Sequence, residues 1–188
     1  MIPSVEGAMA IHAKYGSSHR VVNHCQAVAM AAKIVADEFK RQGRAVDEDA
    51  VIAGALLHDI GRARIQTVRH GVEGAEILKN EGVDEKVVEV VRRHVGAGIS
   101  PEEAKTLGLP DFDYIPRTLE ERIVCFSDKM VDADNVRPFG EEVRRFTAKS
   151  HDVGRLLALK RGLADELGED PEKLILDKIK ESRTKAAK

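Results

Sequence analysis

Residues 53–64 read AGALLHDIGRAR, an apolar run that ends in the adjacent polar pair His58 and Asp59. An almost unbroken apolar run is typical of a helix that is buried on most of its sides. A buried carboxylate without a partner costs several kcal/mol. The pair therefore needs a cation or a dense hydrogen-bond network, and other parts of the chain must supply it.

The rest of the chain carries helical patterns. Between residues 18 and 41, apolar side chains recur at intervals of three and four, which indicates one face of an amphipathic helix. There is no internal repeat and no alternating run long enough for a useful strand. We therefore predict an all-α fold, with extra helices at both ends of a central core, and helices over 18–41, 47–61, 71–82, 84–95, 100–108, 118–133, 139–167 and 171–182.

Length and composition favour one compact domain. The chain has 188 residues, of which 43% are apolar, and no break in composition divides it. We expect a single domain over 1–188, with a core at about 18–135, C-terminal helices at 138–184 and a frayed tail. Cys25 and Cys125 lie far apart within apolar helical runs, so we expect two small core residues and no disulfide.

Charge and hydropathy restrict the possible partners. The 30 basic residues nearly balance the 32 acidic ones, so nucleic acid is not indicated as a partner and an anionic membrane exerts no general attraction. No run of about 18 apolar residues exists, and the N-terminal segment lacks the pattern of a secretory signal. We expect a soluble, cytoplasmic protein with no membrane partner.

Polar side chains on two further predicted helices could share a cation with His58 and Asp59. His24 borders the apolar stripe of helix 18–41, and Asp128 lies one turn after a buried position of helix 118–133. Either residue alone is compatible with a hydrogen-bonded core position. Together the two imidazoles and two carboxylates form a nitrogen and oxygen shell suited to Mn, Fe, Co, Ni or Zn. We therefore predict a divalent metal site.

These residues carry a family resemblance. His24, the pair His58 and Asp59, and Asp128 resemble the H…HD…D signature of the HD-domain superfamily of metal-dependent phosphohydrolases. LLHDIGR is similar to the HDIG subgroup. The resemblance covers roughly residues 21–134 and implies a core of about five helices in which the four side chains hold one metal ion.

Two more histidines resemble those of the binuclear branch of that superfamily. His70 stands in RHGVEGAEIL and His94 in VVRRHVGAG, each similar to a second-metal segment. The resemblance implies two ions per chain, with Asp59 bridging them. The alternative is that both are exposed histidines at helix ends. His12, His19 and His151 have no comparable context, and we expect them at the surface.

The loop after His58 and Asp59 contains arginines that could contact a phosphoryl group. Two divalent ions would activate a water molecule and neutralise phosphoryl oxygens, and cationic side chains would stabilise the growing negative charge. We predict catalytic roles for Asp59 and Arg62. The predicted substrate-binding residues are Arg20, Arg62, Arg64, Arg69 and Lys129.

The sequence predicts a metal-dependent phosphomonoesterase or phosphodiesterase, and the substrate is less well defined. VRRHVGAG and VCFSDKM are loosely similar to a region of bacterial HD-type diadenosine tetraphosphate hydrolases, which favours a nucleotide or another small phosphoester. Two alternatives stay open. One is a non-catalytic nucleotide-binding or regulatory module, and the other is a di-iron oxygenase that uses the same ligands.

Overall fold

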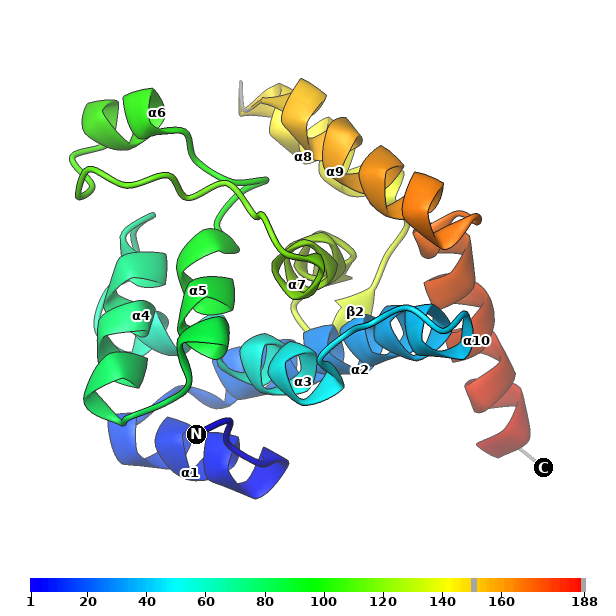
Figure 1. Ribbon diagram of the computed structural model, residues 1–188, viewed down its shortest axis with the longest axis horizontal. Helices are drawn as coiled ribbons and strands as arrows, with labels where there is room; N and C mark the ends of the chain where they lie inside the picture. The colour runs from blue at the N-terminus through cyan, green and yellow to red at the C-terminus, as the bar shows by residue number, and fades with distance from the viewer. Residues whose placement is uncertain (150–151, 187–188) are drawn as a thin grey trace.

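A computed structural model describes residues 1–149 and 152–186 of the chain. Figure 1 shows an arrangement of helices with a single small hairpin, so the predicted all-α class is confirmed. The helices that carry the predicted site are α2 (His19–Arg41), α3 (Glu48–Leu57), α4 (His70–Asn80), α5 (Glu85–Arg93) and α7 (Leu119–Lys129). The other elements are α1 (Val5–Tyr15), η1 (Ile60–Ala63), α6 (Pro101–Thr106), β1 (Val131–Asp132), β2 (Asn135–Val136), α8 (Phe139–Ala148), α9 (Val153–Leu167) and α10 (Pro171–Ala186).

Local sequence sets where the core helices begin. The side chains of Ser18 and Asp47 accept hydrogen bonds from backbone amides in the first turns of α2 and α3. Thr118 and Glu121 form a complete capping box at the start of α7. Each cap provides an acceptor for a backbone amide that the first turn of its helix leaves without a partner.

Helix α3 lies at the centre of the molecule (Figure 1), packed against α1, α2, α5 and α7. Seven of its residues, from Ala50 to Leu57, are buried, as its apolar sequence predicts. Gly54 lets α5 approach closely, because a Cβ atom at this position would lie 2.6 Å from Val90. Helices α8, α9 and α10 lie along the other side of α2 and α7 (Figure 1).

Several element bounds differ from the sequence-based expectations. The helix predicted over 47–61 ends at Leu57, and the 3₁₀ helix η1 follows it. The helix predicted over 118–133 ends at Lys129, and the antiparallel hairpin of β1 and β2 follows it. In its turn Ala133 has a φ of 56°, a strained value for a residue with a side chain. Helix α10 runs to Ala186, past the expected end at residue 182.

Two other expectations can be compared with the structure. Cys25 and Cys125 are both buried free thiols, as predicted. Over residues 1–149 and 152–186, no helix is long and apolar enough to cross a membrane.

Candidate metal centre

Five elements bring the predicted ligands to one place. His24 projects from the first half of α2, and His58 and Asp59 follow the last residue of α3. Helix α4 begins at His70, and α5 ends just before His94. Asp128 lies in the last turn of α7. The structure thus gathers all six predicted ligand residues, five of which lie at or next to helix ends.

The four histidines share one hydrogen-bonding arrangement. Each Nδ1 atom lies within 2.8 Å of a backbone carbonyl oxygen. A carbonyl group only accepts, so each Nδ1 carries the proton and each Nε2 presents a lone pair. The carbonyl partners of His24, His58, His70 and His94 are Ala133, Ala55, Thr67 and Val91, respectively.

The free Nε2 atoms face the two carboxylates and one another. Asp128 Oδ1 lies 3.0 Å from His24 Nε2 and 3.5 Å from His58 Nε2. Asp59 Oδ1 lies 3.1 Å from His70 Nε2 and 3.4 Å from His94 Nε2. An ion with bonds of about 2.1 Å places neighbouring ligand atoms about 3 Å apart. The observed spacings therefore suit ligands that surround a metal ion.

The ligand atoms form two groups that share Asp59. One group contains His24, His58 and Asp59, and the other contains Asp59, His70 and His94. Within each group one candidate ligand atom per residue lies within 4.8 Å of the others. This sharing is the arrangement that a bridging carboxylate would have.

The site is electrostatically unsatisfied without a cation. Among the described residues, the buried atoms His58 Nε2 and Asp59 Oδ1 have no hydrogen-bond partner. The Nε2 atoms of His70 and His94 lie 3.0 Å apart, lone pair against lone pair in the tautomers assigned above. Unpartnered buried polar atoms are costly. The donor set therefore fits divalent metal ions.

The protonation states of the buried groups favour cation binding. Burial lowers the pKa of His94 to about 4, so this imidazole is neutral at pH 7. Burial alone would raise the pKa of Asp59 and Asp128. For Asp59 the surrounding imidazoles, His58 first, outweigh burial, and for Asp128 Lys129 does, so both pKa values lie well below normal. The ionised carboxylates and the neutral His94 are in the forms that bind metals. Despite their burial, the acidic groups around His24 and His58 raise the pKa of both imidazoles, so these two would release a proton when an ion binds.

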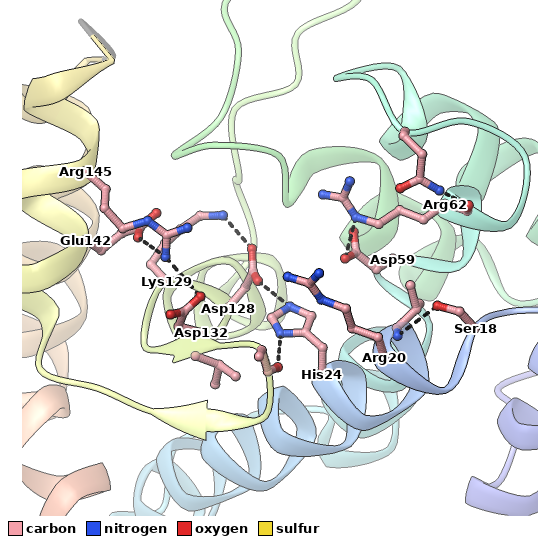
Figure 2. A pocket seen from close by; sticks show the side chains of 14 residues that line it. Ser18, Arg20, His24, Asp59, Arg62, Asp128, Lys129, Asp132, Glu142 and Arg145 are labelled. Atoms are coloured by element: carbon pink, nitrogen blue, oxygen red, sulfur yellow. Dashed lines mark hydrogen bonds and ion pairs between the residues drawn. The ribbon is translucent and has the colours of Figure 1, made fainter.

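A cavity of about 490 Å³ opens beside His24, Asp59 and Asp128. In Figure 2, Arg20 and Arg62 reach into this cavity from one side and Lys129 from the other. Arg62 Nε donates to Asp59 Oδ2 at 2.6 Å, and Lys129 Nζ donates to Asp128 Oδ2 at 2.5 Å. Each carboxylate thus turns one oxygen toward the histidines and the other toward a cation.

The structure separates the predicted substrate-binding residues into two sets. Arg20, Arg62 and Lys129 line the cavity, whereas Arg64 and Arg69 do not. Both of these arginines pair with Glu73, at 3.6 Å and 3.2 Å, respectively. Arg64 and Arg69 are therefore not part of the proposed substrate site.

Residues that sequence reasoning missed form the opposite wall of the cavity. Asp132 of β1 and Glu142 and Arg145 of α8 line it. Arg145 pairs with Asp132 at 3.3 Å and with Glu142 at 3.4 Å (Figure 2). No motif marks these residues, and only the i, i+3 spacing of Glu142 and Arg145 on one helix face hints at a shared position.

The histidines without a predicted role lie in different places. His19 is exposed, as expected. His12 is only 2% exposed, so the expectation that it lies at the surface is wrong. His151 falls outside the described residues.

Gly61 brings η1 against the start of α4. A Cβ atom here would lie 2.6 Å from Gly74 N and closer still to the His70 carbonyl oxygen. The absence of a side chain therefore lets Asp59 and His70 come within contact distance.

Comparison with known proteins gives a consistent result. The family model described as HD domain matches residues 21–131. A tRNA (cytidine(56)-2'-O)-methyltransferase of Thermoplasma volcanium is 37% identical over 93% of this chain, which spans about half (51%) of that protein. Ribonuclease Y of Thermosipho melanesiensis is 30% identical over 73% of this chain and 29% of its own length.

Among solved structures, the HD domain of the Listeria monocytogenes phosphodiesterase PgpH is similar, with a TM-score of 0.54. The match covers 85% of this chain and 92% of that one, at 19% identity. At this identity the likeness concerns the fold, and it agrees with the predicted helical core.

Proposed function

This chain belongs to the HD domain family, and we propose that it hydrolyses phosphoester bonds with the help of two divalent metal ions. The observation that carries the proposal is the convergence of five side chains into two groups that share Asp59, with Asp128 Oδ1 beside His24 and His58 of the first group. Buried atoms in both groups lack partners among the described residues, and a cavity with cationic side chains lies beside them.

Each proposed ion has its own ligands. His24, His58 and Asp128 would hold one ion and His70 and His94 the other, with Asp59 contacting both. When bound, the ions would make a water molecule nucleophilic near neutral pH and offset charge on the phosphoryl oxygens. Mn, Fe, Co, Ni and Zn all suit nitrogen and oxygen ligands.

The chain's own cations have two tasks in this proposal. Arg62 orients Asp59 through its Nε atom, and the rest of its guanidinium group faces the cavity (Figure 2). These remaining N–H groups would donate to phosphoryl oxygens. Arg20 also lines the cavity and forms no ion pair with another described residue, so it is available for an anionic substrate.

The proposed substrate is a nucleotide or another small phosphoester. A second candidate, the phosphodiester backbone of RNA, is favoured by one specific observation. Two relatives carry names that refer to RNA, a tRNA methyltransferase and a ribonuclease. The near-neutral charge of this chain gives no separate support for RNA.

Two other readings of the site have less support. A regulatory module that does not catalyse a reaction can dispense with ligands, whereas all six are present here. A di-iron oxygenase needs a means of holding an organic substrate by chelation, and the cations around this cavity suit a phosphoryl group better.

The experiment is a substrate panel with protein loaded separately with Mn, Co, Ni and Fe. The panel contains phosphomonoesters, nucleotides, dinucleoside polyphosphates and short single-stranded RNA, each assayed with and without oxygen. We expect product release that is independent of oxygen, lost in Asp59→Asn and retained in Asp37→Asn, a matched change on the exposed side of α2. No release from any substrate, or turnover only with iron and oxygen, would overturn the proposal.

A further inference from the structure

Helix α1 lies outside the segment that matches the HD domain, yet it packs against α3 and η1. Only two of its side chains, Ala8 and His12, are fully buried. A buried imidazole is unfavourable unless its nitrogen atoms find partners. The partners of His12 therefore indicate why an imidazole stands at this interface.

Both nitrogen atoms of His12 are hydrogen-bonded. Nε2 lies 2.7 Å from the Leu56 carbonyl oxygen, and Nδ1 lies 2.8 Å from the Ser17 hydroxyl. Because the carbonyl only accepts, Nε2 donates to it, and Nδ1 accepts from Ser17. His12 thus has the opposite tautomer to the four histidines of the metal centre.

The Leu56 carbonyl belongs to the last turn of α3, two residues before His58. Carbonyl groups in the last turn of a helix lack an intrahelical amide partner. Two successive carbonyls here receive imidazole donors instead, Ala55 from His58 Nδ1 and Leu56 from His12 Nε2. These bonds hold the last peptide groups of α3, directly before His58 and Asp59.

We propose that His12 is a positioning residue for the metal centre, because it holds the end of α3 so that His58 and Asp59 point at the shared site. The inference rests on the proposed function, in which both residues bind metal. It assigns a role in the centre to a helix that precedes the matched family segment.

Conservative variants separate this role from simple packing. The side-chain amide of His12→Gln can place an N–H near the position of Nε2, whereas that of His12→Asn reaches only the position of Nδ1. We expect His12→Asn to bind Mn²⁺ about tenfold more weakly than the parent, as changes around metal ligands commonly do. His12→Gln should stay within about threefold of the parent.

Manganese binding is measured by titration calorimetry on the full chain, with thermal unfolding of the metal-free variants beside it. Ile175→Val, a core change in α10 away from the site, is the control for lost stability and should keep the parent affinity. Ser17→Ala removes the donor to His12 Nδ1 with a smaller disturbance, and should weaken binding about two- to fivefold.

The outcomes are distinct. Parent affinity in His12→Asn, or an equal loss in Ile175→Val, would overturn the inference and leave the proposed function standing. If His12→Asn does not fold, Ser17→Ala decides, and parent affinity in that variant would overturn the inference. A parent that binds no manganese is titrated with cobalt, nickel and iron instead, and a parent that binds none of these ions would overturn the proposed function and the inference with it.

Discussion

Replacing Gly61 by alanine should open the metal centre without touching a ligand. A Cβ atom at residue 61 would lie 2.6 Å from Gly74 N, and real Cβ contacts are essentially never below 3.0 Å. The two backbones must therefore separate by about 0.4 Å for this contact alone, and by more for the nearer His70 carbonyl oxygen. Ligand distances in metal sites are held to about 0.2 Å, so the contact between Asp59 and His70 should no longer suit an ion.

The same overpacking should lower stability. Alanine in place of glycine normally gains up to about 1 kcal/mol in a compatible helix. Forcing extra atoms into a packed interface costs about 1–3 kcal/mol, and the clash here is with backbone atoms that cannot rotate away. We therefore expect the free energy of unfolding of metal-free Gly61→Ala to fall by about 1–2 kcal/mol.

The assays are urea unfolding in the presence of a chelator and manganese titration of the folded protein. Gly162→Ala is the matched control, because its Cβ atom would meet only the Arg122 guanidinium, at 3.9 Å. This control should bind two ions and be as stable as the parent or more so. Two ions bound to Gly61→Ala with the parent affinity, and no loss of stability, would refute the reasoning.

Three further predictions concern single side chains. His94→Ala should bind about one manganese ion per chain where the parent binds two, and elemental analysis that finds equal content in both would remove His94 from the site. Arg62→Ala should lose roughly 10- to 1000-fold in turnover while keeping its metal, because a donor to the phosphoryl group is gone; an unchanged rate in steady-state assays contradicts that role. Lys33 and Lys40 lower the pKa of Glu48 from its normal value of 4.5 to about 2. The ionised Glu48 carboxylate therefore stabilises the fold above pH 4.5, and this contribution disappears as the pH falls toward 2. Metal-free Glu48→Gln should therefore be less stable than the parent at pH 7, by less than about 1 kcal/mol, with the difference shrinking in acid unfolding series; a constant difference from pH 7 to pH 3 argues against the ion pairs.

The core helices and the convergence of His24, His58, Asp59 and Asp128 could be predicted from the sequence because both depend on local periodicity. His24 and Asp128 stand beside apolar stripes at helical spacing, and such a stripe must face the core. His70 and His94 required the family resemblance, since each lies at a helix end where periodicity gives no direction.

The different positions of Arg62 and Arg64 could not be predicted from the sequence. In a 3₁₀ turn, side chains at i and i+3 lie above one another. This geometry places Arg62 beside Asp59 and turns Arg64 toward Glu73. No sequence pattern indicated that η1 follows α3, so proximity along the chain suggested the same role for both arginines.

Long-range contacts account for the remaining omissions. Arg145 reaches the cavity only because α8 folds back beside β1. His12 is buried because α1 packs across the end of α3, 44 residues further along the chain. No sequence pattern places His12 at the end of α3 or Arg145 at the cavity, so three-dimensional packing was needed to locate both.

The proposal that two ions share Asp59 can be tested by anomalous diffraction from crystals soaked in manganese. We expect two anomalous peaks per chain, one contacting His24, His58 and Asp128 and the other His70 and His94, with Asp59 contacting both. Well-diffracting soaked crystals with no peak at these side chains, or with peaks only elsewhere on the surface, would contradict it.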